Sequence, residues 1–181
     1  MSLSRDWSYT NNVKGKLGST SVHGICMTTS CHWAKHTVKA KKALASPIGV
    51  SLLAAGAMHV VRTKEQAAID AAGGSFTGRV DQWHMGFFDS MNMVGWRYAY
   101  GSGVCSPTSN KGVYVLTIYG NGGHTMAFAR FSSRSVFFDP NFGQYSCSAS
   151  VFSSFKKDIR KFIAATYPGL LNSWFVYKVN L

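Results

Sequence analysis

The stretch Phe-Phe-Asp-Pro-Asn at residues 137–141 ends an apolar run on a carboxylate, Asp139. Residues 113–119 and 124–131 form two earlier apolar runs, separated by a glycine-rich turn. Successive side chains of a strand point to opposite faces of a sheet, so each run can bury one face. We therefore expect an antiparallel sheet in which His124, starting the second strand, lies beside Asp139, ending the third.

A histidine beside a buried carboxylate is two thirds of a catalytic triad, the general base and the group that orients it. The missing member is a nucleophile, and Cys26 lies in the first turn of an expected helix. Unpaired N–H groups and the helix dipole favour a thiolate there. The sequence thus predicts a triad of Cys26, His124 and Asp139, with the Cys26 backbone N–H as one donor to an oxyanion.

The remaining segments predict helices before the sheet, which is the order of an α+β fold. Residues 81–93 fit a helix, but Gly86 weakens the pattern. The chain divides into a polar leader, residues 1–23, expected to be flexible, and a single domain, residues 24–181. The other expected elements are helices over residues 24–46, 48–61, 63–72 and 150–167, and a closing strand over residues 173–179.

The charge of the chain is strongly positive. It has 19 Lys and Arg against 7 Asp and Glu, a net charge of +12. Such an excess favours anionic partners, among them an anionic membrane surface. We see no zinc finger, aromatic-basic RNA signature or basic arm, so no nucleic-acid partner is expected. No apolar run is long enough to span a membrane, and we expect a monomer.

Cysteine and histidine cluster near the expected nucleophile, which raises a metal site as an alternative. The spacing of Cys26, Cys31, His32 and His36 distributes them around a helix instead of converging them on one ion. We therefore expect no metal. A core-rich chain of this size does not need disulfides, so its four cysteines, which include Cys105 and Cys147, are expected to be free thiols.

Three motifs carry a resemblance to a known family. They are Gly-x-Cys at residues 24–26 with Trp33 behind it, Gly-His at 123–124 entering an apolar strand, and Phe-Phe-Asp-Pro-Asn-x-Gly at 137–143. Together they resemble the YopT/AvrPphB cysteine proteases, bacterial effectors of papain-like fold. The resemblance covers about residue 24 to the C-terminus. It implies a papain-like α+β fold, in which an N-terminal helical part carrying the nucleophile packs on an antiparallel sheet carrying His and Asp.

The resemblance also implies an activity. By position, Cys26 is the nucleophile, His124 the general base and Asp139 the group that orients the imidazole. The implied reaction is hydrolysis of a host protein without a cofactor, by an effector that a bacterium secretes into the host cell by a type III-like route. Papain-type families place a polar side chain, usually Gln or Asn, just before the nucleophile as an oxyanion donor, and here the candidates are Ser21 and Thr20.

Two other functions stay open from the sequence. The same triad performs glutamine deamidation, or acyl transfer as in a transglutaminase, when the amide or the acceptor differs. A basic binding module without catalysis is the second alternative. A chain of net charge +12 repels a polybasic segment, so we expect a neutral or acidic target, or one on an anionic membrane, unless acids such as Asp81 and Asp89 line the cleft.

Overall fold

A seven-stranded antiparallel sheet forms the centre of the molecule. The computed structural model describes residues 3–8, 16–17, 20–21, 25–47 and 52–181. The strand order is β1-β8-β7-β6-β5-β9-β4, with every neighbouring pair antiparallel. The strands are β1 (Ser4–Ser8), β4 (Val94–Gly101), β5 (Gly112–Gly120), β6 (Gly122–Arg130), β7 (Arg134–Asp139), β8 (Gly143–Ser148) and β9 (Ser173–Asn180), with β2 (Lys16–Leu17) and β3 (Thr20–Ser21) forming a separate pair.

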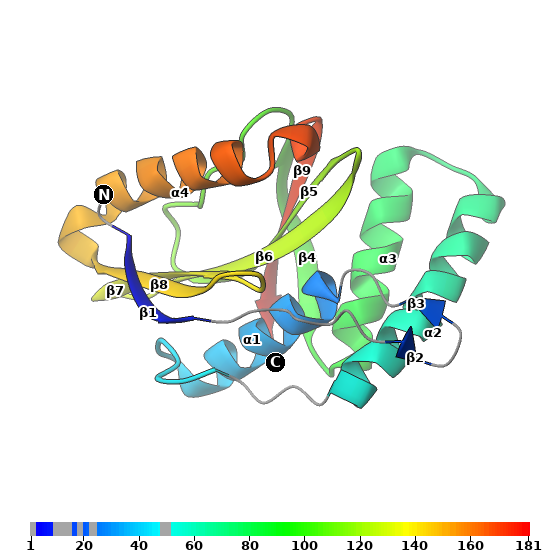
Figure 1. The fold of residues 1–181 in the computed structure, drawn as a ribbon, viewed down its shortest axis with the longest axis horizontal. Coiled ribbons are helices and arrows are strands. Elements are labelled where there is room, and N and C mark those ends of the chain that lie inside the picture. The colour runs from blue at the N-terminus through cyan, green and yellow to red at the C-terminus, as the bar shows by residue number, and fades with distance from the viewer. Residues whose placement is uncertain (1–2, 9–15, 18–19, 22–24, 48–51) are drawn as a thin grey trace.

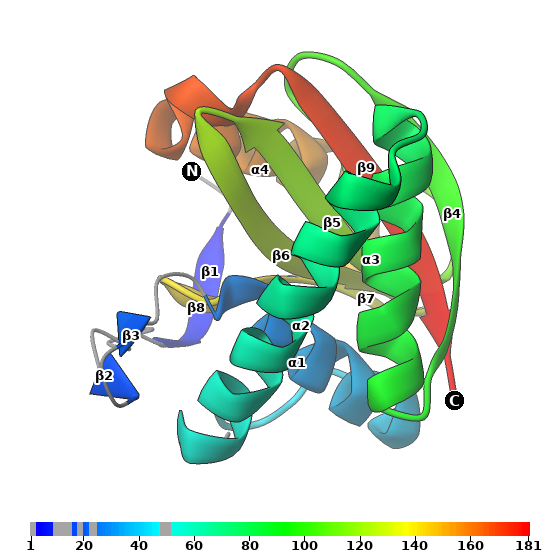
Figure 2. The same ribbon diagram turned by 90° about the vertical axis from the view of Figure 1, so that its right-hand side faces the viewer.

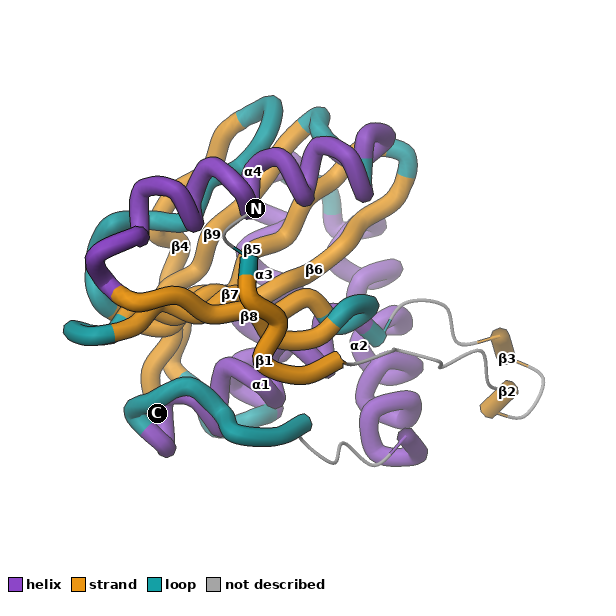
Figure 3. The backbone as a smooth tube through the Cα atoms, turned by 60° about the vertical axis from the view of Figure 1, so that its left-hand side comes forward, coloured by secondary structure: helices purple, strands orange, loops and turns teal. Residues whose placement is uncertain are grey.

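Helices cover both faces of the sheet (Figures 1 and 3). They are α1 (Cys26–Ala40), α2 (Leu52–Ala72), α3 (Phe76–Ser90) and α4 (Phe152–Thr166), with short 3₁₀ turns η1 (Ala149–Val151) and η2 (Pro168–Leu170). α1 and α3 pack on one face and α4 on the other, while α2 runs beside α3 (Figure 2). The predicted α+β class, a helical N-terminal part on an antiparallel sheet, is confirmed.

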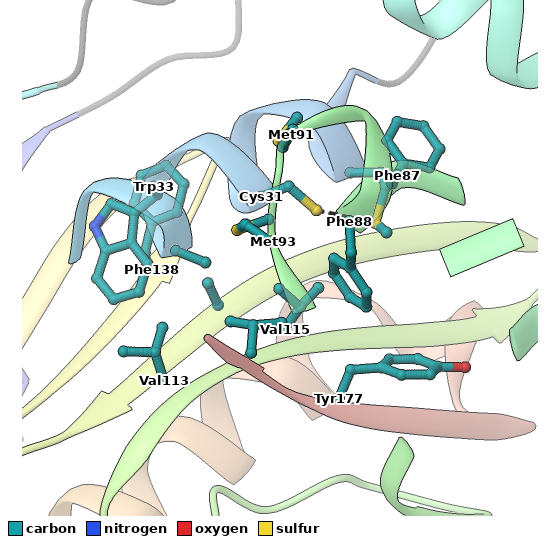
Figure 4. Packing of buried hydrophobic residues seen from close by; sticks show 14 of the residues in the cluster. Cys31, Trp33, Phe87, Phe88, Met91, Met93, Val113, Val115, Phe138 and Tyr177 are labelled. Atoms are coloured by element: carbon teal, nitrogen blue, oxygen red, sulfur yellow. Dashed lines mark hydrogen bonds between the residues drawn. The ribbon is translucent and has the colours of Figure 1, made fainter. Parts of the chain in front are cut away.

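Each face of the sheet has its own hydrophobic core. Alternation along β6 places Ala127 in the core under α1 and α3, and Phe128 in the core under α4. Figure 4 shows the first of these cores, where Trp33 of α1 and Phe88 of α3 pack above Tyr177 of β9 and its neighbours. Both cores are rich in aromatic side chains, so α1 and α4 are held firmly against opposite sides of β6.

A buried polar contact fixes the position of α1 on the sheet. The ring of Trp33 stacks on that of Phe138, with centroids 5.5 Å apart, and its Nε1–H donates to Gln144 Oε1 at 3.0 Å. The Nε2 of Gln144 in turn donates to Asp6 Oδ2 at 2.8 Å and to the Leu44 carbonyl at 2.9 Å. Because Gln144 is fully buried, these bonds are costly to break. They set where the N-terminus of α1 meets the sheet.

Two helix boundaries differ from the prediction. The helix expected to reach residue 46, before Pro47, ends at Ala40. Lys41 adopts the left-handed conformation, φ 53°, and its N–H donates to the carbonyls of Thr37 and Val38. Glycine is the usual residue at a C-cap of this left-handed conformation. Because the sequence has a lysine there, it did not indicate that the helix ends at this point.

The two helices predicted over residues 48–61 and 63–72 are a single helix, α2. It begins at Leu52, and residues 48–51 lie outside the part of the chain that the structure describes. The ambiguous residues 81–93 belong mostly to α3, whose N-cap Ser75 accepts from the Gly78 N–H at 3.1 Å. None of the described helices is long and apolar enough to cross a membrane.

Three strands of the sheet have no counterpart in the prediction. β4 is a largely exposed edge strand and β8 is mostly polar, so neither shows an apolar alternation. β1 comes from the segment expected to be a polar leader, and it pairs with β8 at the opposite edge. Its Asp6 accepts from Gln144 and Ser146 of β8, so side-chain hydrogen bonds take the place of an apolar face.

Candidate active site

Strand register brings His124 and Asp139 together. β6 and β7 pair Ala127 with Phe138, so Asp139 lies diagonally across from His124 on the same face of the sheet. The distance between His124 Nε2 and Asp139 Oδ2 is 3.2 Å. The side-by-side placement expected from the sequence is therefore present in the structure.

The carboxylate of Asp139 is fully buried and each oxygen has a donor. The backbone N–H of Asn141 donates to Oδ1 at 2.8 Å, and the hydroxyl of Tyr167 donates to Oδ2 at 2.9 Å, beside the His124 ring. The bond from Asn141 closes the Asp-Pro-Asn turn after β7. One motif thus ends the strand and fixes the carboxylate, which therefore has a single orientation toward His124.

The imidazole of His124 is held on two sides. Its Nε2 faces Asp139, and the ring of Tyr167 stacks on it with centroids 4.3 Å apart and an interplanar angle of 29°. This leaves Nδ1 for the hydrogen bond that His124 makes with Cys26. Burial lowers the pKa of His124, but the hydrogen bonds and negative charges of Asp139 and Cys26 outweigh it and raise the pKa to about 9.

Cys26 is the first residue of α1 and is half-buried. Burial raises the pKa of its thiol, yet the hydrogen bond to His124, the charge of that ring and backbone hydrogen bonds with Thr125 and Met27 lower it below the ordinary value overall. The other three cysteines are buried free thiols whose pKa is raised, chiefly by burial: Cys31, Cys105 and Cys147. The prediction of free thiols is confirmed, and only one thiol is activated.

The site is assembled from both faces of the sheet. His124 and Asp139 project on the α4 side, as alternation from Phe128 and Phe137 requires, whereas Cys26 comes from the helix on the opposite side. The two sets meet at the start of β6, which is paired with β5 but, before Ala127, not with β7. An added side chain at Gly120 of this turn would collide with the carbonyl of Gly169 in η2. The turn and η2 are therefore packed backbone to backbone next to the site.

Tyr167 is a member of this arrangement that the sequence reasoning missed. It follows α4 directly and was expected only as the end of that helix. Its N–H donates to the Ile163 carbonyl at 2.9 Å and its hydroxyl accepts from Asn141 Nδ2 at 3.2 Å. The available signal was the aromatic residue at a helix end before Pro-Gly. That pattern becomes informative only once the C-terminal end of α4 is known to lie beside Asp139, the last residue of β7.

Of the three candidate oxyanion donors, the structure describes Cys26 in full. The N–H of Cys26 lies at the N-terminus of α1, where the helix dipole favours negative charge. The backbones of Thr20 and Ser21 form β3, but their side chains lie outside the described part of the structure. Their expected role as a second donor stays a prediction.

A cavity of about 530 Å³ adjoins the site through Tyr119, whose pKa is raised by burial and by the nearby Cys26. It is lined by Gln66, Asp70, Phe76, Arg79, Val80, Trp83 and Tyr119. The acid in it, Asp70, is paired with Arg79 at 3.1 Å. Asp81, the other acid considered for the cleft, accepts hydrogen bonds from Arg97 and Tyr177. Its charge is therefore compensated and does not make the cleft acidic.

The alternative metal ligands do not come together. Among the described residues, no group of three or more His, Cys, Asp or Glu side chains is placed to hold an ion. Cys31 contacts the sulfur of Met27, 3.9 Å away, inside the core. Both ring nitrogens of the buried His84 have hydrogen-bond partners. Nδ1 lies 2.7 Å from Val80 O and Nε2 lies 2.8 Å from Thr117 Oγ1, so this histidine is a satisfied core group.

Comparisons with known proteins agree with this geometry. Residues 104–176, which include β5 to β8 and α4, match the model of the Peptidase_C58 family, described as Yersinia/Haemophilus virulence surface antigen. The whole fold is similar to the crystal structure of the Pseudomonas avirulence protein AvrPphB, with a TM-score of 0.68 and 14% identity over 96% of each chain. The curated proteins give no match. The resemblance to the YopT/AvrPphB proteases and the papain-like fold are thereby confirmed, and the two likenesses together support a cysteine peptidase.

Proposed function

We propose that this protein is a cysteine peptidase that cleaves a host-cell protein with a triad of Cys26, His124 and Asp139. The observation that carries the proposal is the imidazole of His124, held between a buried carboxylate and a thiol whose pKa it lowers. A cysteine that serves only as a core residue has a raised pKa, as the other three do here.

The chemistry follows from the placement of each group. The Cys26 thiolate attacks the carbonyl carbon of the scissile amide, and the negative charge passes to the carbonyl oxygen, which the Cys26 N–H faces. His124, protonated and oriented by Asp139, gives its Nδ1 proton to the leaving amine as the C–N bond breaks. Water then hydrolyses the thioester with His124 as the base, which releases the acid and restores the thiol–imidazole pair.

The similarity to a virulence family supports a host protein as substrate and delivery from a bacterium into the host cell. The charge of the chain, +12, favours a neutral or acidic target or one on an anionic membrane. The cavity beside Tyr119 supports the same preference, because its carboxylate is already neutralised by Arg79.

The test is a cleavage survey of a eukaryotic cell lysate, read by mass spectrometry of new N-termini. Wild-type protein should create a small set of termini that Cys26→Ala does not create, and Cys147→Ala, a matched loss of a thiol with raised pKa, should behave as the wild type. Identical termini in wild type and Cys26→Ala would refute the peptidase. Deamidated or transamidated glutamines without new termini would instead establish the alternative that uses the same triad.

A second test examines the thiol itself. Alkylation of Cys26 by iodoacetamide, followed by intact mass, should remain fast well below pH 8, because His124 lowers the pKa of the thiol. In His124→Ala the imidazole no longer lowers the pKa of Cys26, and burial raises it instead. Alkylation should therefore be slow until the pH is alkaline. Equal, slow labelling of all four cysteines in wild type would favour a basic binding module without catalysis.

A further inference from the structure

A second cavity lies at the opposite end of the same strands. Its volume is about 590 Å³, and it opens between the C-terminus of α1, the start of β5, the end of β6 and the end of β9. Figure 1 shows the end of β9 next to α1 on this side of the molecule. Arg130, in its wall, is six residues along β6 from His124, which is about 20 Å at 3.3 Å per residue. The cavity is therefore separate from the site around Cys26.

Its charge is entirely positive. The cations in its lining are Lys41, Lys111, Arg130 and Lys178, and no aspartate or glutamate lines it among the described residues. The side chains of Lys41 and Lys111 are exposed beside the hollow, whereas alternation along β6 and β9 directs those of Arg130 and Lys178 toward the α4 face. The two exposed lysines raise the local concentration of anions. An anion placed there would gain attraction without displacing an existing ion pair.

The cations are held in place by neutral groups. Lys111 Nζ donates to Ser132 Oγ at 3.0 Å, the Arg130 guanidinium lies 3.9 Å from the centroid of the Phe152 ring, and Lys178 Nζ lies 5.8 Å from that of Trp96. These contacts reduce the freedom of the side chains but leave their charges uncompensated. Lys178 passes over Gly112, where any side chain would collide with its Cε.

The polar atoms in the wall suit an oxygen-rich anion. Thr37 is fully buried and lines the cavity, and its hydroxyl has no hydrogen-bond partner. Buried hydroxyls rarely stay unpaired, so a missing partner needs an explanation. The Thr37 and Val38 carbonyls, which would repel an anion, already accept from the N–H of Lys41.

We propose that this cavity binds a compact anion that carries several phosphate groups, such as a phosphorylated inositol ring. Phosphate carries nearly two negative charges and three acceptor oxygens, which matches lysine donors supplemented by hydroxyls. The volume is in the range of small-molecule sites. The same chemistry is offered by a membrane phosphoinositide headgroup and by a soluble inositol polyphosphate. The assignment does not depend on the peptidase activity.

The experiment measures binding to both sources. One arm titrates full-length protein with inositol hexakisphosphate in a calorimeter, and the other sediments it with phosphatidylcholine vesicles that contain phosphatidylinositol bisphosphate. The test variant is Lys41→Gln/Lys111→Gln, two exposed side chains whose loss leaves the core intact. The matched control is Lys156→Gln/Lys157→Gln, which removes the same charge from α4 around a different, smaller cavity.

We expect binding in at least one arm, weakened about tenfold or more by the test pair and less than about twofold by the control pair. The arm that shows it identifies a lipid or a soluble source. Absence of binding in both arms would overturn the proposal, and so would equal weakening by the two pairs, since that indicates net charge alone. Displacement by a single-stranded oligonucleotide at lower phosphate concentration would overturn it too, in favour of nucleic acid.

Discussion

The strand β6 carries the imidazole of His124 near its start and borders the basic cavity at its end, and the charged groups at these two ends are arranged in opposite ways. At the first end a buried carboxylate, an imidazole and a thiol satisfy one another, and an aromatic ring covers them. At the second end the exposed Lys41 and Lys111 border an open hollow that no carboxylate of the described residues lines. A buried set of charges can tune pKa values, whereas an exposed set of one sign can attract a ligand. The predictions below test whether the two ends act independently.

The largest effect is expected from Asp139→Asn. The amide keeps the size of the side chain but removes the charge. Its N–H₂ must face either the Asn141 N–H or the hydroxyl of Tyr167, both of which donate to the carboxylate in the wild type. We expect kcat/KM to fall by about 10²- to 10³-fold on a cleaved peptide. Asp81→Asn, a carboxylate paired elsewhere with Arg97, should change it less than about twofold. Binding at the basic cavity should be unchanged in both variants.

The next effect is on stability. Trp33→Phe keeps an aromatic ring over Phe138 but leaves the buried Oε1 of Gln144 without its donor. The free energy of unfolding in urea should fall by about 1–3 kcal/mol. Trp96→Phe, at a half-exposed position, should change it by about 0.5 kcal/mol or less. A loss of activity in Trp33→Phe larger than its loss of folded protein would mean that α1 also shifts at Cys26.

A smaller effect is expected at Tyr167, which acts through its neighbours. Tyr167→Ala removes the ring that stacks on His124 and admits water to the carboxylate, so screening should lower the pKa of the imidazole from about 9. The alkaline limb of the activity profile, where His124 loses its proton, should move to lower pH, with about a tenfold loss of rate. Tyr167→Phe keeps the stacked ring and should move the limb much less. An unmoved limb in the alanine variant would make Tyr167 merely structural.

The smallest effect should come from salt. Between 50 and 300 mM NaCl the Debye length shortens from about 14 to about 6 Å, below the separation of the two ends throughout, and screening acts mainly on exposed charges. Cleavage of an uncharged peptide should change by less than about twofold, whereas anion binding at the basic cavity should weaken severalfold. A parallel loss of both would show that the ends are coupled.

The sequence predicts the placement of His124 beside Asp139 better than it predicts the sheet. The pair of His124 and Asp139 follows from two apolar strands and the Asp-Pro turn, because local patterns specify where each strand begins and ends. β4 and β8 were missed because an edge strand and a polar strand are stabilised by pairing, which single-segment patterns do not report. Tyr167 was missed for a related reason: its role depends on the direction in which α4 crosses the sheet.

The position of β9 has a consequence for how the chain folds. This strand, Ser173–Asn180, is the last in sequence but lies between β5 and β4, so β4 has no partner until it arrives. During synthesis β4 therefore waits while more than seventy residues are made, and contacts of such long range form slowly. Tyr167 arrives just before β9 and completes the cover over His124. A growing chain thus leaves His124 without its aromatic cover until α4 has been made.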